Sequence, residues 1–260
     1  MTVCIVANTL KDSGLAFSKE IEAMLEARGV AVIPENEGEN ADFWIILGGD
    51  GTMLQAAHKA ALVDVPLLGI NLGTMGFLTD VDKHDGFAAI DNILAGRYES
   101  QKRLMLMAKT NAGTGGLSSD NLALNEVYVG SAGRLTNFAV YVNGRHMDDI
   151  RADGVIVATP TGSTAYNLSA GGPILAPYGQ MMVVTAICPH SLSTRPWVIE
   201  ADDIVQIIPG QCANLLLDGH ERMNLLPGES IKISRAPVSA TIIKTTSTHF
   251  YEVLRKKKII

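Results

Sequence analysis

The sequence is short of cysteine, charge and long apolar runs, and each shortage argues against a class of protein. Its 3 cysteines lie far apart and form no C-x-x-C pair, which supports neither a disulfide framework nor a zinc knuckle. Charged residues make up 18% of the chain and the net charge is −6, so bulk electrostatics do not favour nucleic-acid binding. The apolar runs are far shorter than the roughly 20 residues of a membrane-spanning helix. We therefore expect a cytoplasmic protein with reduced thiols and with neither a membrane nor a nucleic-acid partner.

Aromatic residues are also scarce, at 5%, whereas glycine is abundant, with 25 residues. Glycine permits tight turns and lets a backbone approach a ligand closely, so this balance is typical of a chain with ligand-binding loops. A chain of 260 residues, 47% of them hydrophobic, is long enough for one or two domains with buried cores. Residues 1–10 carry no basic stretch before their apolar run, which predicts a first strand and not a signal peptide.

The apolar pattern divides the chain into two parts. In residues 1–97, short apolar runs alternate with segments of helical spacing, which predicts a Rossmann-like open α/β sheet. We expect strands at residues 3–7, 30–33, 43–47 and 66–71, helices at residues 13–28, 52–63 and 87–94, and a surface loop at residues 35–40.

From residue 98 the period of the apolar pattern changes to two, and strands follow one another with little helix between them, which predicts a β-rich domain. Asn143-Gly144 follows an alternating run and predicts a tight hairpin. Residues 111–120 are expected to form a flexible hairpin loop, and the basic residues 255–258 a solvated terminus. The strands are expected at residues 104–109, 122–129, 137–142, 155–158, 181–187, 204–208, 213–217, 231–234 and 240–244.

The most distinctive local feature of the first part is the motif GGDGT (48–52). It lies between an expected buried strand and an expected helix, at the strand end where parallel sheets bind ligands. Its glycines let backbone N–H groups approach a phosphate, and the helix N-terminus favours negative charge. Asp50 would then bind an accompanying metal ion or take a proton from an attacking hydroxyl. The alternative is a tight turn in which Asp50 caps the helix.

Two further loops have a composition suited to ligands. Residues 69–79 (GINLGTMGFLT) follow the next strand and would share a crevice with GGDGT, although a plain turn is an alternative. Residues 159–174 (TPTGSTAYNLSAGGPI) offer hydroxyls for hydrogen bonds to a sugar, amide or phosphate. Tyr166 supplies a single ring that can stack on a base. The alternative for this stretch is a hydroxyl-rich loop that enters a helix at Ser163 or Thr164.

Isolated polar residues complete the candidates. Asn125-Glu126 interrupts an apolar strand and can bind a ribose diol, although on its own it is more typical of a strand edge that faces solvent. Arg151 and Asp153, taken alone, indicate a surface ion pair or a turn. The histidines are scattered, so no zinc site is predicted.

Taken together, these motifs resemble those of the bacterial ATP-NAD kinases. GGDGT alone is shared with lipid kinases and, in a related form, with 6-phosphofructokinases, whereas the stretch TPTGSTAY is far more specific. The segments that carry the resemblance, in the family's order over most of the chain, are GGDGT (48–52), NLGTMGFLT (71–79), LNE (124–126), RADG (151–154), TPTGSTAYNLSAGGPI (159–174), PHSLSTRP (189–196) and DGH (218–220).

The resemblance implies a fold and a reaction. The fold is an α/β domain of residues 1–97, completed by residues 236–260, and a β-sandwich that binds NAD in residues 98–235. The reaction is transfer of the γ-phosphate of ATP to the 2′-hydroxyl of the adenosine ribose of NAD, which produces NADP. Mg²⁺ would bridge the ATP phosphates, and no residue is assigned as its ligand. Relatives form homodimers or homotetramers, so the same is expected of this chain.

The resemblance also implies roles for single residues. Asp50 would be the general base, Asn125 and Glu126 would hold the adenosine ribose, and Tyr166 would pack against the dinucleotide. Asp153 would reach the nicotinamide side from a neighbouring subunit. The implied loop for the ATP phosphates consists of Gly48, Gly49, Gly51 and Thr52. The implied NAD site consists of Asp50, Gly51, Phe77, Asn125, Glu126, Arg151, Asp153, Thr161, Thr164, Ala165, Tyr166, Asn167, Leu168, Ser169 and His220.

Three positions bear on how the family pattern applies. The basic Arg151 resembles relatives that prefer NAD over NADH. His220 stands where the family often has glutamine or another polar residue. The loop 130–136 is shorter than in some relatives.

Three other classes remain as alternatives. A lipid or diacylglycerol-type kinase would share GGDGT but would need an apolar acceptor pocket. A sugar-phosphate kinase would need a basic acceptor site. A dinucleotide sensor without catalysis would have no need of a base at Asp50.

Overall fold

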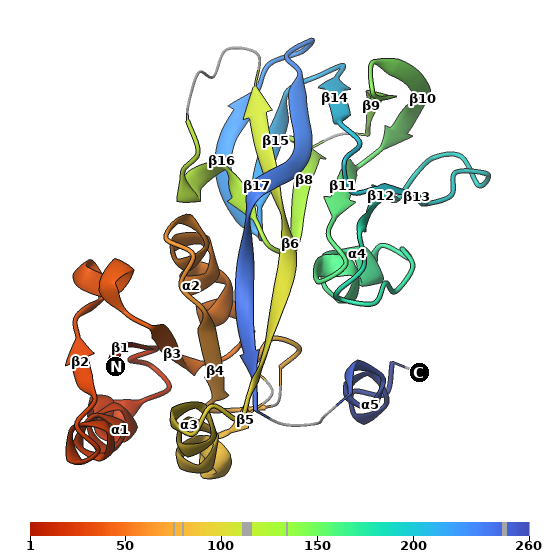
Figure 1. The fold of residues 1–260 in the computed structure, drawn as a ribbon. Helices are drawn as coiled ribbons and strands as arrows, with labels where there is room; N and C mark the ends of the chain where they lie inside the picture. Colours follow the sequence, from red (N-terminus) through yellow and green to blue (C-terminus); the bar gives the residue numbers. More distant parts are fainter. Residues whose placement is uncertain (75, 80, 111–115, 134, 246–248, 260) are drawn as a thin grey trace. The chain divides into compact units, whose positions relative to one another are not determined.

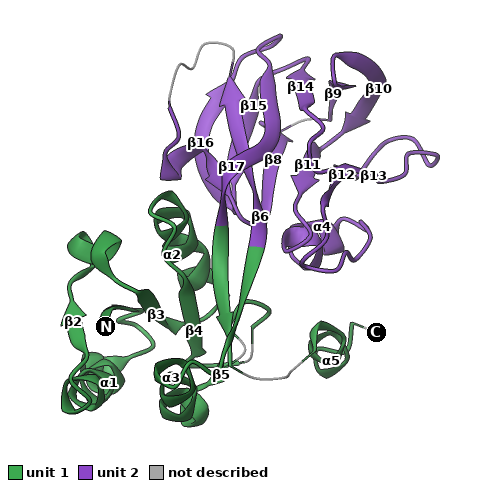
Figure 2. Cartoon of the chain, viewed as in Figure 1, with its two compact units in different colours: residues 1–102, 240–260 green, residues 103–239 purple. Residues whose placement is uncertain are grey.

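A computed structural model shows two compact units, one of residues 1–102 with 240–260 and one of residues 103–239 (Figure 2). The structure describes residues 1–74, 76–79, 81–110, 116–133, 135–245 and 249–259. Part of the hairpin loop expected at residues 111–120 therefore lies outside the described residues; its end forms a short 3-10 helix, Ser119–Asn121.

The first unit is built on a parallel sheet. Its strands lie in the order β2-β1-β3-β4, and β5 pairs with β4 in the same direction. The parallel pairing confirms the open α/β sheet predicted from the alternating pattern. The strands are β1 (Thr2–Ala7), β2 (Ala31–Ile33), β3 (Phe43–Gly48), β4 (Leu67–Asn71) and β5 (Val81–Asp82).

Helices cover both faces of this sheet (Figure 1). The apolar residues of α1 and α3, among them Ile21 and Ile90, share one buried cluster with Ile45 of β3. The helix α2 packs on β3 and β4, and β3 is buried along its whole length because both of its faces are covered. The helices are α1 (Ala16–Ala27), α2 (Asp50–Leu62), α3 (Gly86–Leu94) and α5 (Phe250–Lys256), with 3-10 turns at Ser13–Leu15, Glu35–Asn40 and Lys83–Asp85.

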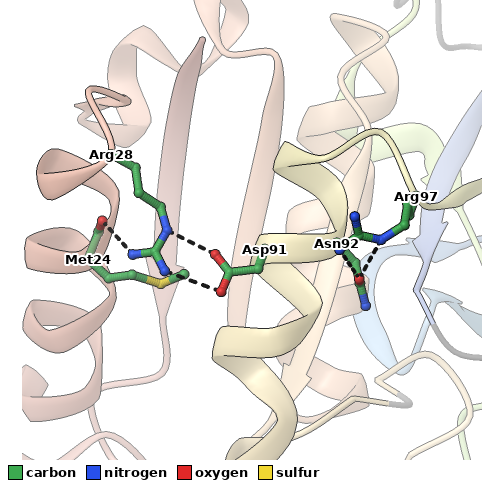
Figure 3. Close-up of polar contacts among 5 residues, drawn as sticks. All are labelled: Met24, Arg28, Asp91, Asn92 and Arg97. Carbon is green, nitrogen blue, oxygen red and sulfur yellow. Dashed lines mark hydrogen bonds and ion pairs between the residues drawn. The ribbon is translucent and has the colours of Figure 1, made fainter.

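The ends of α1 and α3 are joined by a charged pair (Figure 3). Arg28 Nε lies 2.9 Å from Asp91 Oδ1, and Arg28 Nη2 donates to Asp91 Oδ2 (3.2 Å). Arg28 Nη1 donates to the carbonyl of Met24 (3.2 Å). Just past α3, Arg97 donates twice to Asn92 Oδ1 (3.1 and 2.9 Å). The bidentate contact orients the guanidinium of Arg28 relative to the carboxylate of Asp91. The pair is exposed, however, so it contributes little to the free energy of unfolding.

The second unit is a β-sandwich, as predicted. One layer has the order β10-β9-β14-β17 with β6 and β7 beside it, and the other has the order β13-β12-β11-β8-β15-β16. Inward side chains of both layers, such as Phe138 and Val157, form one buried cluster. The strands are β6 (Glu99–Thr110), β7 (Leu122–Ala123), β8 (Glu126–Ser131), β9 (Thr136–Val142), β10 (Arg145–Ala152), β11 (Gly154–Ala158), β12 (Met181–Ile187), β13 (Trp197–Glu200), β14 (Val205–Pro209), β15 (Ala213–Leu217), β16 (His220–Leu225) and β17 (Ile231–Lys244).

Several elements confirm the pattern and several differ from it. Asn143 and Gly144 form the predicted hairpin, with φ of 51° and 75°, between β9 and β10. The strand expected at residues 122–129 is two strands, because it is interrupted just before Glu126. The strands expected at residues 231–234 and 240–244 are one, β17, which contributes to both units.

The remaining differences concern exposed elements. The edge strands β10, β13 and β16 were missed because at least half of the side chains in each are exposed, which hides the apolar alternation. The loop expected at residues 35–40 is a 3-10 helix, whose Gly38 carbonyl accepts a hydrogen bond from the indole of Trp44 (2.9 Å). Within the described part of the chain, no helix has the length and apolarity required to cross a bilayer.

Candidate active site

The glycine-rich loops of the first unit start from neighbouring strands. β3 and β4 pair in parallel with Gly48 opposite Asn71, so the GGDGT loop and residues 72–79 begin at the same edge of the sheet, as predicted. Gly49 is the N-cap of α2. Glycine has no side chain that could accept hydrogen bonds from the first amides of a helix, and these amides have no acceptor within the helix. This edge therefore offers backbone donors that suit an anion.

Asp50 is the first residue of α2, and its carboxylate binds the neighbouring loop. Phe77 N donates to Oδ2 (2.8 Å), whereas Leu78 N, Thr79 N and the Thr79 hydroxyl donate to Oδ1 (3.0, 3.2 and 3.2 Å). The alternative in which Asp50 caps its own helix is therefore wrong, because Gly49 holds that position. These bonds fix the orientation of the carboxylate.

The same contacts explain why residue 76 is glycine. A Cβ on Gly76 would overlap Asp50 Oδ1 well inside van der Waals contact. Within the described residues, Oδ1 receives three hydrogen bonds and Oδ2 only one. A carboxylate offers about four acceptor sites on its two oxygens, so Oδ2 retains capacity for a further donor such as a hydroxyl.

In the second unit, Asp218 holds the LNE segment. Its carboxylate accepts hydrogen bonds from the backbone N–H groups of Leu124 (2.8 Å), Asn125 (2.8 Å) and Glu126 (3.0 Å). Its own N–H donates to the carbonyl of Glu126 (3.0 Å). Sequence reasoning assigned no role to Asp218. A signal was present, because the dipeptide Asp218-Gly219 has φ of 49° and 78° and aspartate tolerates this left-handed region better than most residues.

The segment 159–162 packs directly on the same LNE segment. Thr159 N donates to the carbonyl of Asn125 (2.8 Å), and the Thr159 hydroxyl donates to the carbonyl of Leu124 (2.6 Å). Gly162 is required by this packing, because a Cβ there would collide with the Asn125 carbonyl group. Two motifs far apart in the sequence therefore form one continuous backbone surface.

Glu126 is buried beside Asp218, with 6% of its surface exposed. Burial raises the pKa of its carboxyl to about 8, the negative charge of Asp218 adds to the rise, and a hydrogen bond from the Tyr166 N–H opposes it. Among the described residues, no partner reaches its Oε2. The expectation of a strand edge that faces solvent is thus wrong. A buried carboxyl oxygen without a partner is an unusual feature that indicates a missing donor or acceptor.

Asn167 organises the loop that follows. Its Nδ2 donates to the carbonyls of Ser163 and Pro173 (3.1 Å each), and its Oδ1 accepts from the Thr185 hydroxyl (2.7 Å). Asn167 is fully buried, and a Cβ on Gly172 would overlap its side-chain amide. Its polar atoms thus stabilise the loop from within.

Two tyrosines form an aromatic surface on the second unit. Tyr166, in the short helix α4 (Tyr166–Ser169), is 41% exposed, and its ring meets the ring of Tyr128 edge to face, with centroids 5.5 Å apart. The ring of Tyr128 lies across Gly130 and Gly154, where a Cβ at either position would collide with it. Tyr128 was missed by sequence reasoning, which named Tyr166 as the ring that packs against the dinucleotide. Its position two residues after Glu126, on the same face of β8, was the available signal.

The other predicted residues differ in exposure. Thr161 is buried, and no described residue reaches its hydroxyl. His220 Nδ1 lies 3.0 Å from the carbonyl oxygen of Asp218. Phe77 packs near Phe250, with centroids 6.4 Å apart, and Lys257 Nζ lies 4.9 Å from its ring centroid. The exposed members are Gly51, Arg151, Asp153, Ser169 and His220, and the half-buried members are Thr52, Phe77, Thr164, Ala165 and Leu168.

One group of side chains in the described part of the chain has metal-binding spacing. It consists of Asp82, His84 and Asp85 and is partly exposed. These residues lie on β5 and the 3-10 turn after it, and they make none of the contacts of the GGDGT loop described above.

Comparisons with known proteins identify the family of the chain. Residues 34–98 match the family model described as ATP-NAD kinase N-terminal domain, and residues 124–245 match the ATP-NAD kinase C-terminal domain. The chain is 40% identical to an NAD kinase from Symbiobacterium thermophilum, over 97% of both chains. It is 41% identical to an NAD kinase from Tolumonas auensis, over 85% of this chain and 77% of that one.

Solved structures have the same fold. A crystal structure of an NAD kinase from Archaeoglobus fulgidus in complex with ATP has a TM-score of 0.81 at 29% identity, with all of both chains covered. Yeast NADH kinase in complex with NADH has a TM-score of 0.83 at 24% identity, covering 98% of this chain and 86% of that one, which shows a shared fold.

The α/β unit with its GGDGT loop and the β-sandwich define a phosphotransferase with an alcohol acceptor. The chain belongs to the NAD kinase family. This confirms the resemblance found in the sequence.

Proposed function

We propose that this chain transfers the γ-phosphate of ATP to the 2′-hydroxyl of the adenosine ribose of NAD and so produces NADP. The observation that carries the proposal is the carboxylate of Asp50, which is held by four hydrogen bonds from residues 77–79 beside the N-terminus of α2. ATP as the donor is supported by the Archaeoglobus fulgidus relative, which was solved with ATP.

Asp50 is the general base of the proposed reaction. A ribose hydroxyl is a weak nucleophile at neutral pH, and a base within hydrogen-bond reach removes its proton as the new bond forms. In this step Asp50 Oδ2 accepts the proton, the 2′-oxygen bonds to the γ-phosphorus, and the bond from that phosphorus to the β-γ bridging oxygen breaks to release ADP. The bonds from residues 77–79 keep the carboxylate oriented, which is the positioning that such a step needs.

The ribose is assigned to Asn125 and Glu126 of the second unit. The unpartnered Glu126 Oε2 is a ready partner for a diol hydroxyl. Because the pKa of Glu126 is raised to about 8, its carboxyl is mainly protonated at neutral pH and can both donate and accept a hydrogen bond. Asp218 and Thr159 keep the backbone of this segment in place.

The rest of the dinucleotide is assigned to the surface beyond this segment. Tyr166, with Tyr128 behind it, offers a ring face, and the unpartnered Thr161 hydroxyl offers a polar contact. Asn167 is assigned to shaping the loop, since its polar atoms bond within it. The remaining members of the proposed NAD site are Gly51, Phe77, Arg151, Asp153, Thr164, Ala165, Leu168, Ser169 and His220.

This assignment gives each of the proposed domains a separate role. Residues 1–97 with 236–260 carry the base and the loop for the ATP phosphates, and residues 98–235 bind NAD. The preference for NAD over NADH is assigned to Arg151. Asp153 is exposed, which is compatible with its proposed contact to NAD across a homodimer or homotetramer interface. The 3 cysteines are free, which supports the proposed cytoplasmic location.

Mg²⁺ is proposed as the metal that accompanies ATP. At the GGDGT loop, Asp50 Oδ1 already accepts three hydrogen bonds. This fits a metal ion that is held mainly by the phosphate oxygens of ATP and not by protein carboxylates. When bound, the ion would neutralise charge on the transferring phosphate.

A coupled assay with ATP, Mg²⁺ and NAD tests the proposal by the formation of NADP. Asp50→Asn is expected to lower kcat by roughly 10²–10⁴, the usual effect of losing a general base, with little change in KM for NAD. Asp64→Asn, at an exposed aspartate after α2, is the matched control. Normal turnover in Asp50→Asn would remove Asp50 from this role. Product with a lipid acceptor and none with NAD would favour the lipid-kinase alternative.

A further inference from the structure

Lys11 is a charged residue beside the glycine-rich loops of the first unit. It lies in the turn that follows β1, and β1 pairs in parallel with β3, so this turn starts from the same edge of the sheet as the GGDGT loop. A Cβ on Gly49 would lie 2.8 Å from Lys11 Nζ, and a Cβ on Gly73 would lie 3.8 Å from the same atom. The ammonium group is therefore directed to the space above both glycine-rich loops.

The turn that carries Lys11 is held by hydrogen bonds to Asn8. Asn8 Oδ1 accepts hydrogen bonds from the N–H groups of Leu10 (3.0 Å) and Lys11 (3.3 Å), and the Asn8 carbonyl accepts a second contact from Lys11 N (3.0 Å). Asn8 Nδ2 donates to the hydroxyl of Thr52 (3.2 Å), within the GGDGT motif. The turn and the loop are thus joined side chain to side chain.

The charge of Lys11 is not balanced in the way that the charges of Lys59 and Arg28 are balanced in the same unit. Lys59 and Arg28 each pair with a carboxylate, at 2.6 and 2.9 Å, whereas no carboxylate in the described parts of the chain forms an ion pair with Lys11. The nearest motif carboxylate, Asp50, is bound to residues 77–79. An ammonium group without a carboxylate partner, beside open helix amides and glycines, attracts a multiply charged anion.

We propose that Lys11 is a phosphate-binding residue of the ATP site, which contacts the β- and γ-phosphates of the nucleotide bound at the GGDGT loop. The proposal rests on the proposed function only in its choice of nucleotide. Gly49 and Gly73 keep Cβ atoms out of the space that the phosphates and the ammonium share. Lysine suits this role because its ammonium is a compact point charge with three donors.

The test compares Lys11→Met and Lys11→Arg with Lys19→Met, a control at an exposed lysine of α1. Binding of MgADP and of adenosine is measured by calorimetry, and KM is measured for ATP and for NAD. Lys11→Met is expected to weaken MgADP and to raise KM for ATP by on the order of ten- to a hundredfold, the range of one charge-assisted hydrogen bond. Adenosine affinity, KM for NAD and the melting temperature should match the control, and Lys11→Arg should recover part of the loss.

Two results would overturn the proposal. One is MgADP affinity in Lys11→Met equal to that of the control. The other is an equal loss for adenosine and MgADP, which would assign Lys11 to the fold of the loop and not to phosphate. Failure of the proposed function gives a different pattern, in which the protein forms no NADP while MgADP binding still depends on Lys11.

Salt dependence provides an independent readout. A charge-charge contact weakens as ionic strength rises. MgADP affinity should therefore fall less steeply with salt in Lys11→Met than in the unmodified protein, and identical slopes would contradict a direct contact between the ammonium and phosphate.

Discussion

Replacing Glu126 by glutamine should change how the stability of the protein depends on pH. Burial raises the pKa of this carboxyl from 4.5 to about 8, with a further contribution from the charge of Asp218. In the unfolded chain the group loses its proton near its ordinary pKa, whereas in the folded protein it keeps the proton up to about pH 8. Between these values the folded state binds more protons, so the contribution of Glu126 to stability falls as the pH rises.

The magnitude follows from the same shift. One pKa unit corresponds to about 1.4 kcal/mol, so a group fully protonated in the fold and ionised in the unfolded chain lowers stability by up to that amount per pH unit. Over the interval from 4.5 to about 8 this amounts to several kcal/mol. Glutamine cannot ionise, so the Glu126→Gln variant lacks this slope. Its stability relative to the unmodified protein should rise through this interval and stay constant above it.

The assay is denaturant unfolding from about pH 5 to about pH 9, which spans most of the interval in which the group titrates. Unfolding is followed by tryptophan fluorescence, to which Trp44 of the first unit and Trp197 of the second contribute. The control is Glu221→Gln, at an exposed position of β16, an edge strand of the layer that contains Glu126. Other titrating groups are common to both proteins and cancel in the difference. A difference in unfolding free energy that does not vary with pH would refute the reasoning, because it would mean that Glu126 ionises normally in the fold.

Three further substitutions test the packing around the two sites. Asp218→Ala removes the acceptor of three backbone amides, at roughly 1–3 kcal/mol each, and should lower the melting temperature and weaken NAD binding in calorimetry; unchanged stability would contradict this. Gly76→Ala places a methyl group against Asp50 and should lower kcat in the NADP assay while NAD affinity is retained, whereas full activity would show that the loop adjusts freely. Tyr128→Ala removes the ring behind Tyr166 and should raise KM for NAD with kcat little changed, and an unaltered KM would exclude this surface from the site.

The regular elements were predictable because each has a strong local pattern. The strand β3 is a continuous apolar run, and α1 buries Phe17, Ile21 and Leu25 at helical spacing. The edge strands were missed for the converse reason, since strands such as β16 expose most of their side chains and show no clean alternation. The long strand β17 was divided in two because the exposed Arg235 and Pro237 and the half-buried Ser239 interrupt its apolar pattern.

The candidate site was partly predictable for a similar reason. Glycine-rich motifs mark the loops, so Asp50 and the segment 159–174 stood out in the sequence. The partners that orient them did not. Asp218 lies about ninety residues from the amides that it binds, as the contacts of Leu124 and Asn125 show. Sequence patterns of period two or 3.6 carry no information at that separation.

The sequence by itself determined the fold class, the family and the loops that carry glycine. These follow from local propensity and from motifs whose residues are contiguous. Only the tertiary structure decided that Glu126 is buried beside Asp218, that Tyr128 lies behind Tyr166, and that Lys11 faces the GGDGT loop. The physical reason is that pKa, burial and the direction of a charge depend on neighbours brought together by packing of distant segments, and such neighbours leave no periodic trace in the chain.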